Sequence, residues 1–178
     1  MTDCCIIGGG IVGLSIAREL AGRGLSVRVL AREGRRDTAS WAAAGIFPPA
    51  PDHANATPNE RLTAWSDRLH RQWARELLDE TGIDTGLRVC GGLHVGRDSR
   101  SRERLLAAAA DWQAKAAACQ WLEAADVAAV EPALASAVAR GAVTCGFALP
   151  DEVQMRPPRH LEALERSCET RGVELVRG

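Results

Sequence analysis

The stretch CCIIGGGIVG, residues 4–13, decides the fold of this chain. Its apolar beginning, residues 4–7, suits a buried parallel strand because it leads directly into three glycines. Apolar residues at helical spacing then predict a helix over residues 11–22, and the β-branched run SVRVL predicts a second strand over residues 26–30. Strand, glycine turn, helix and strand in this order form a βαβ unit.

The rest of the chain alternates predicted helices and strands after one irregular segment. Residues 36–58 are dense in alanine, proline and small polar residues, which predicts a long irregular crossing. Helices are expected over residues 59–81, 102–119, 124–130 and 157–172, and strands over residues 87–95, 142–147 and 173–176. The side chains expected to face a core are Val12, Ile16, Ala17 and Leu20 in the first helix, Leu62, Trp65, Leu69, Trp73 and Leu77 in the second, and Leu105, Ala109, Trp112 and Ala116 in the third.

Charge and composition narrow the class of protein. A formal net charge of -1 and an aromatic content of 4% give no basis for binding nucleic acid or an anionic membrane. No apolar stretch is long enough to span a bilayer, and the N-terminal MTDCCIIGGG lacks the basic leader of a secretory signal. The six cysteines form no CxxC pair and no zinc-like cluster, and the four histidines share no motif. We therefore expect a cytoplasmic globular protein without a metal site.

Gly8, Gly10 and Gly13 form a GxGxxG motif, which is a weak signal alone and a strong one between a strand and a helix. The first glycine allows a tight turn, the second lets the backbone approach a pyrophosphate, and the third lets the helix pack close to the strand. The phosphates then accept hydrogen bonds from free N–H groups at the positive end of the helix dipole. We predict a dinucleotide site, the alternative being a structural turn without a ligand.

The residue that usually identifies the dinucleotide is missing. An acidic side chain about twenty residues after the motif normally binds the ribose hydroxyls, but this chain has Ala31, followed by Arg32 and Glu33. One interpretation is that Arg32 binds the 2′-phosphate of NADP, which would make the protein an NADP-dependent dehydrogenase. The other is that the dinucleotide is FAD, with its ribose held more loosely. Residues 1–35 leave both interpretations open.

The run ASWAAAGIFPP, residues 39–49, resembles the D-amino-acid oxidase family of FAD enzymes and is most similar to its glycine oxidase branch, which is linked to thiamine synthesis. In that family the segment returns to the flavin, and its small residues let the backbone lie against the pyrophosphate and the ring. Three further stretches fit the same family in order: TGIDTG with CGGLHVG (81–96), EAADVAAVEPAL (123–134) and RPPRHLEALERSCETRGVELVRG (156–178). The resemblance therefore covers essentially the whole chain.

The resemblance implies a fold, a domain division and a cofactor, FAD. The implied fold class is α/β: a Rossmann-like FAD-binding βαβ domain with an inserted α+β portion of a substrate domain, incomplete at its C-terminal end. The FAD-binding domain would comprise residues 1–82 and 152–178, and the first part of the substrate domain residues 83–151. Carried over residue by residue, the cofactor-binding positions are Gly8, Gly10, Ile11, Val12, Gly13, Ala31, Arg32, Ala39, Ser40, Ala44, Gly45 and Ile46. The chain departs from the family at Ala31, where a glutamate is usual.

The activity that the resemblance implies is oxidation of the amine of glycine or another small amino acid to an imine, with O2 as the acceptor. No catalytic residue is assigned, because the substrate-binding arginine and the aromatic pocket wall normally come from a C-terminal half that we expect to be absent. A small amino acid is the expected partner, and a homo-oligomer is a further expectation because the family often forms one. A non-catalytic, nucleotide-binding remnant is the remaining alternative.

Overall fold

The protein divides into two compact units in the computed structural model, which describes residues 1–34 and 38–178. The first unit comprises residues 1–45, 69–87 and 154–178, and the second comprises residues 46–68 and 88–153. Each unit has an apolar core of its own. The predicted domains, residues 1–82 with 152–178 and residues 83–151, stay a prediction.

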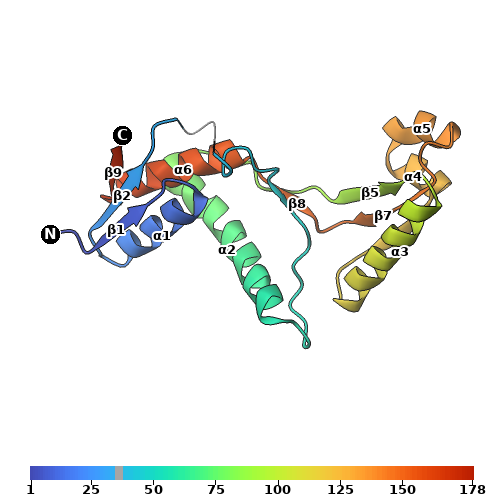
Figure 1. The fold of residues 1–178 in the computed structure, drawn as a ribbon, viewed down its shortest axis with the longest axis horizontal. Coiled ribbons are helices and arrows are strands. Elements are labelled where there is room, and N and C mark those ends of the chain that lie inside the picture. Colours follow the sequence, from blue (N-terminus) through green and yellow to red (C-terminus); the bar gives the residue numbers. More distant parts are fainter. Residues whose placement is uncertain (35–37) are drawn as a thin grey trace. The chain divides into compact units, whose positions relative to one another are not determined.

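A parallel sheet forms the centre of the first unit (Figure 1). Its order among the described residues is β1 (Cys4–Ile7), β2 (Val27–Ala31) and β9 (Glu174–Arg177). Helix α1 (Ile11–Gly22) connects β1 to β2, which run parallel. The predicted βαβ unit is confirmed, and each of its three elements lies within one residue of the predicted bounds.

Two helices cover one face of this sheet. Helix α1 and helix α6 (Pro157–Thr170) pack against each other and against the face of β2 that carries Val27 and Val29. These two valines are buried, whereas Arg28 and Leu30 on the other face are exposed. Helix α6 begins with two prolines, whose fixed φ suits the first helical turn and whose missing N–H costs no hydrogen bond there. The alternation along β2 therefore decides which face receives the helices.

A buried arginine joins three helices of the first unit. Arg18 of α1 is 2% exposed, and its guanidinium lies 2.8 Å from carboxylate oxygens of both Glu76 and Glu80 in α2 (Pro58–Thr81). Its Nε donates a hydrogen bond to Ser167 Oγ of α6 at 3.0 Å. The hydrogen bond from Arg18 holds the pKa of the Glu76 carboxyl below its usual range. The apolar pattern of residues 11–22 gives no sign of this network.

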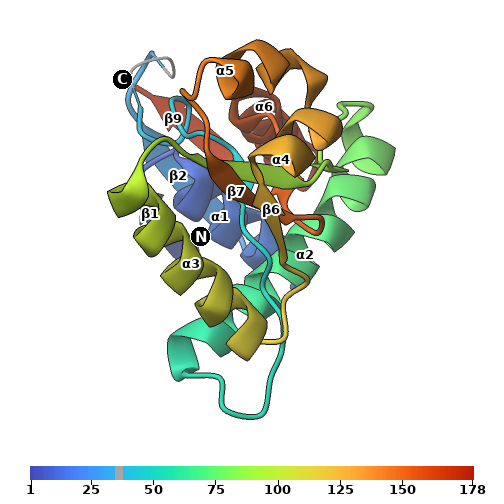
Figure 2. The same cartoon turned by 90° about the vertical axis from the view of Figure 1, so that its right-hand side faces the viewer.

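The second unit is built on an antiparallel sheet (Figure 2). Within the described residues its strands follow the order β5 (Gly92–Gly96), β7 (Cys145–Leu149) and β6 (Gln120–Glu123). Helix α3 (Ser99–Ala114) packs on the face where Phe147 is buried. A capping box of Asp98 and Ser101 starts this helix, because each side chain accepts a hydrogen bond from the backbone of the other residue.

Short helices cover the opposite face of this sheet. They are α4 (Ala124–Val130), the 3-10 turn η2 (Pro132–Leu134) and α5 (Ala135–Ala139). Val127 of α4 is fully buried and packs with Leu122 of β6. The prediction for residues 124–130 is confirmed, while η2 and α5 were not predicted.

A further sheet joins three two-residue strands in the order β3 (Ile46–Phe47), β8 (Val153–Gln154) and β4 (Arg88–Val89), counting described residues only. Strands this short leave no alternating pattern in the sequence, so β3 and β8 were not predicted. The segment 36–58 is otherwise irregular as predicted up to the first residue of α2, and its positions 36 and 37 lie outside the described residues. Glycines 91 and 92 separate β4 from β5 inside the predicted strand 87–95.

The predicted core-facing side of α1 is wrong in part. Val12 is 69% exposed and Ile16 46% exposed, whereas Leu14 and Ala17 are buried. Only the side of α1 that meets β2 and α6 is covered by described residues, and this side is narrower than the apolar stripe of the sequence. Helical spacing therefore located the stripe and overestimated its buried width.

Two other helices also correct their predictions. In α2, Trp73 and Leu77 pack into the core of the first unit as predicted. The prediction is wrong for Leu62 and Trp65, which are 59% and 56% exposed and lie in the part of α2 that belongs to the second unit. Helix α3 ends at Ala114 and not at residue 119, since Ala116 has a φ of 60° and leaves the helix. No helix in the described ranges is both long and apolar enough to cross a bilayer.

Candidate dinucleotide site

Two glycines shape the loop between β1 and α1, one through its backbone conformation and the other through close packing. Gly8 has a φ of 117°, in the region that favours glycine, and its N–H donates to the Leu30 carbonyl at 2.8 Å. A Cβ on Gly13 would lie 1.9 Å from the Gly8 carbonyl oxygen. The loop thus has the tight turn and the close helix packing that the first and third glycines of the motif predict.

The N-terminal end of α1 presents backbone N–H groups that its own side chains do not cap. Gly10 is the N-cap residue and makes no side-chain hydrogen bond, and the first turn contains no acidic residue. The Ile11 N–H donates instead to Ser40 Oγ at 3.1 Å. A Cβ on Gly10 would lie 3.0 Å from the same hydroxyl oxygen. The fold therefore brings Ser40, which is 29 positions further along the chain, to the glycine loop.

Ala31, at the end of β2, lies beside the same loop. A Cβ on Gly9 would lie 2.7 Å from the Ala31 Cβ, so the two positions are in close contact. Arg32 follows directly and is exposed. Gly9 was not among the predicted site residues, because the motif specifies only the glycines on either side of it. The signal that could have identified it is the unbroken run of three glycines.

The remaining predicted positions lie in two places. Ala39 lies in the same turn as Ser40. Ala39 and Ala44 are both exposed. Gly45 has a φ of 69°, and its carbonyl accepts a hydrogen bond from the Met155 N–H at 2.8 Å, next to the start of α6. Ile46 begins β3 in the second unit and is 60% exposed. The structure therefore brings the glycine loop, Ala31 and Ser40 together, whereas Gly45 lies next to the start of α6.

Residues 3–178 match the model of the family described as DAO, FAD dependent oxidoreductase. The chain belongs to this family. The match includes both the glycine loop and the segment that carries Ser40. The resemblance to the D-amino-acid oxidase family is therefore confirmed, and so is its cofactor, FAD. This finding sets aside the NADP interpretation of Ala31 and Arg32.

Individual relatives of the DAO family agree with this assignment. The bifunctional protein ThiO/ThiG of Nostoc sp. is 32% identical over 178 residues, which are 99% of this chain and 26% of that protein. Glycine oxidase of Geobacillus kaustophilus is 29% identical over 170 residues, or 96% of this chain and 44% of that enzyme. The solved structure of glycine oxidase from Bacillus cereus is similar with a TM-score of 0.86 and 25% identity, covering 99% of this chain and 46% of its own. The chain thus spans about half or less of the length of these relatives.

The likeness to these DAO-family structures confirms the predicted α/β fold class. The glycine loop also fits the cofactor of the family. A side chain is excluded at Gly13 and would crowd Ser40 at Gly10, and the first turn of α1 carries no acid that would repel a phosphate. The residues that contact FAD stay a prediction.

Proposed function

We propose that this chain carries the FAD-binding part of a flavin-dependent oxidase that converts the amine of glycine or another small amino acid to an imine, with O2 as the acceptor. The observation that carries the proposal is the glycine loop, which packs the start of α1 against β1 and leaves the N-terminal end of the helix without an acidic side chain. Relatives named glycine oxidase, one of them 29% identical, support the substrate class. A link to thiamine synthesis rests on the ThiO/ThiG relatives.

In the proposed site the glycine loop and Ser40 bind the pyrophosphate together. A hydroxyl can accept one hydrogen bond and donate another. Ser40 already accepts from the Ile11 N–H, so its own O–H can donate to a phosphate oxygen at the end of α1. Ala31 offers no carboxylate to the ribose, which leaves backbone groups and Arg32 to hold that end of the dinucleotide. The twelve positions predicted from the sequence remain the proposed FAD contacts.

The proposed chemistry requires this chain to orient the flavin more than to supply an acid or a base. FAD, when bound, supplies the ring that accepts a hydride from the α-carbon of the substrate. β1, α1 and β2 would hold the bound dinucleotide, so that the flavin would be oriented with little loss of entropy during reaction. No catalytic side chain is assigned among the described residues.

FAD affinity and substrate-dependent peroxide formation test this proposal. The wild-type chain is expected to bind FAD. Gly13→Ala is expected to weaken binding by about tenfold or more, because the added methyl group pushes the start of α1 away from the Gly8 carbonyl. Gly178→Ala adds the same methyl where nothing lies within 4 Å, so it should keep wild-type affinity. Equilibrium dialysis with flavin fluorescence measures both.

Two outcomes count against separate parts of the proposal. Tight binding of NADPH with no binding of FAD would contradict the cofactor site. Stoichiometric FAD binding without flavin reduction or peroxide formation from glycine, sarcosine or D-alanine, in a protein that joins this chain to a substrate-binding part, would contradict the oxidase activity while leaving the FAD site in place.

A further inference from the structure

A short turn, residues 38–42, carries Ser40 to the start of α1. The Trp41 N–H donates to the Thr38 carbonyl at 3.1 Å and to the Thr38 hydroxyl at 3.3 Å, and the Ala42 N–H donates to the same carbonyl at 3.0 Å. All three hydrogen bonds lie within the turn, so they set its shape but not its place on the first unit. A contact outside the turn is needed to fix where the Ser40 hydroxyl lies.

The side chain of Trp41 provides that contact. It is half-buried and packs against the apolar core that α1, β2 and α6 share. The alanines on either side of it, at positions 39 and 42–44, are exposed. Among residues 38–44, Trp41 is therefore the apolar side chain that connects the turn to the core, and large aromatic rings contribute most to contacts of this kind.

The position of the Ser40 hydroxyl allows little displacement. Its oxygen accepts a hydrogen bond from the Ile11 N–H at 3.1 Å, and a shift of the turn by about 0.5 Å away from α1 would break that bond. On the side of the loop, a Cβ on Gly10 would lie 3.0 Å from the same oxygen, so the hydroxyl is already close to the backbone there. Ile11 packs against the same core as Trp41. The core therefore fixes both the residue that donates this hydrogen bond and the neighbour of the residue that accepts it.

We propose that Trp41 is a positioning residue for FAD. By packing on the core it keeps the Ser40 hydroxyl at the N-terminal end of α1, where that hydroxyl donates to a phosphate oxygen of the cofactor. Trp41 acts through Ser40 and need not touch FAD, so it lies outside the twelve predicted contacts. The inference rests on the proposed FAD site, and it names a residue that the glycine motif does not predict.

A double-mutant cycle on the binding of FAD to the 178-residue chain tests this role. Ser40→Ala should weaken binding about tenfold, as expected for the loss of one hydrogen bond to a charged phosphate. Trp41→Leu should weaken it by about the same factor, because the displaced hydroxyl no longer reaches the phosphate. The double variant should still lose about tenfold and not about a hundredfold, since the second substitution removes a contact that the first has already broken. Equilibrium dialysis with flavin fluorescence measures each Kd.

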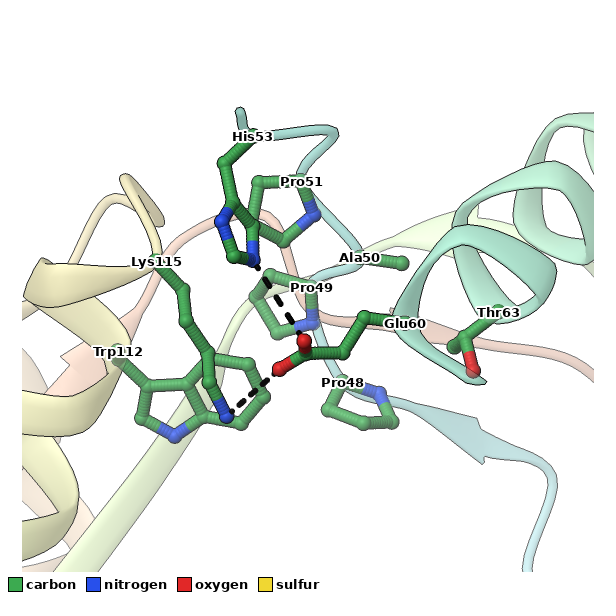
Figure 3. Close-up of a pocket in the computed structure, with 9 residues that line it drawn as sticks. All are labelled: Pro48, Pro49, Ala50, Pro51, His53, Glu60, Thr63, Trp112 and Lys115. Atoms are coloured by element: carbon green, nitrogen blue, oxygen red, sulfur yellow. Dashed lines mark ion pairs between the residues drawn. The ribbon is translucent and has the colours of Figure 1, made fainter. Parts of the chain in front are cut away.

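Two further tryptophan variants separate positioning from general packing. Trp41→Phe keeps an aromatic ring on the core and should keep the FAD affinity within about threefold of wild type. Trp112 is the matched control, because it is also half-buried and packs on a core, that of the second unit, where it lines a cavity (Figure 3). Trp112→Leu should lower the midpoint of urea unfolding, as Trp41→Leu does, and should leave FAD binding unchanged with or without Ser40→Ala.

Thr38→Val tests the same role if Trp41→Leu does not fold, because it changes the turn and leaves the packing of the core intact. It removes the hydroxyl that accepts from the Trp41 N–H, so it should weaken FAD binding about threefold in the wild-type chain and not at all in Ser40→Ala. Wild-type affinity in a folded Trp41→Leu chain, or losses that multiply in the double variant, would show that Trp41 has no positioning role while the FAD site stays in place. A wild-type chain that does not bind FAD would instead overturn the proposed site and this inference with it.

Discussion

Ser40 and Gly10 lie close together at the start of α1, and the small size of the glycine makes room for the serine hydroxyl. The serine hydroxyl accepts a hydrogen bond from the Ile11 N–H, the first of the helix, and a Cβ on Gly10 would lie 3.0 Å from the hydroxyl oxygen. A serine or aspartate at the N-cap itself would bond the second or third N–H of the helix and would occupy N–H groups that a phosphate could otherwise bind. Supplying the hydroxyl from a distant turn keeps the end of the helix open.

His160 of α6 is a buried titratable residue that makes the stability of the folded chain depend on pH. It is fully buried, and neither ring nitrogen has a hydrogen-bond partner among the described residues. Its ring centroid lies 5.4 Å from that of His70. Burial first, and then the positive charges of His70 and Arg18, lower the pKa of His160 to about 4. The folded chain therefore holds this imidazole neutral well below the pH at which it would protonate in the unfolded chain.

The folded chain should lose stability in a defined pH window because of His160. Its unfolded-state pKa is near 6.5, so the unfolded chain takes up the proton first as the pH falls. The contribution of the neutral imidazole is complete above pH 6.5 and is lost between about 6.5 and about 4, to a total of about 3 kcal/mol. Urea unfolding across this range should show the slope, and His160→Leu should flatten it.

The control for this prediction is His94→Leu, because the His94 side chain is 42% exposed and should leave the slope in place. An unchanged slope in His160→Leu, with both variants folded, would mean that another group controls the acid sensitivity. Equal flattening in the two variants would point to a general effect of removing a histidine.

At the level of single residues, the sequence predicts the glycines of the loop but not the residues that contact them. Gly8 and Gly13 could be identified because only glycine satisfies the turn and the close packing. Ser40 was found through the family resemblance, since a contact across 29 positions leaves no spacing pattern. The four histidines share no sequence motif, so no local pattern could reveal that His70 and His160 lie with their ring centroids 5.4 Å apart.

At the scale of elements, the first unit depends on one cation placed among three helices. The Arg18 side chain pairs with Glu76 and Glu80, donates to Ser167, and has its Cζ 4.8 Å from the centroid of the Trp73 ring. A buried charge that loses its partners is costly, and so are carboxylates that lose their cation. The network should therefore stabilise the packing of α1, α2 and α6 more than any exposed ion pair does.

Arg18→Met is expected to lower the free energy of unfolding by about 2 kcal/mol, because Glu76 loses its cation and Glu80 is left with Arg171 alone, while both carboxylates are partly exposed. Arg23→Met is the matched control on the same helix. Its i,i+4 pair with Glu19 is exposed, so the loss should stay below about 1 kcal/mol. Urea unfolding of both variants measures the difference. Equal losses would show that burial of Arg18 adds nothing to the strength of its ion pairs.

Elements could be predicted where a residue type marks their ends. The prolines at the start of α6 and the glycine loop before α1 fixed those boundaries. The end of α3 was misplaced because Ala116 takes a left-handed conformation that glycine usually supplies. Two-residue strands such as β3 exist only through their partners in the sheet, so no local pattern could reveal them.

At the scale of the whole molecule, the glycine loop and Ser40 belong to the first unit, whereas Ile46, another predicted FAD contact, belongs to the second. Helix α2 contributes residues to both units, which is why its apolar stripe does not face a single core. A ligand of one unit should therefore stabilise that unit first.

FAD should protect the two units unequally against hydrogen exchange. Ligand at about 100 times its Kd stabilises the state that binds it by about 2.7 kcal/mol. If FAD binds at the glycine loop, slower exchange should appear in β1, α1 and β2, whereas β5 and β7 should exchange as they do without the cofactor. Mass spectrometry of peptides from each unit measures this, with Gly13→Ala as the variant in which the protection should disappear. The amides nearest a bound pyrophosphate must open for the dinucleotide to leave, so they should be the ones protected. Protection confined to β5 and β7 would therefore place the cofactor outside the glycine loop.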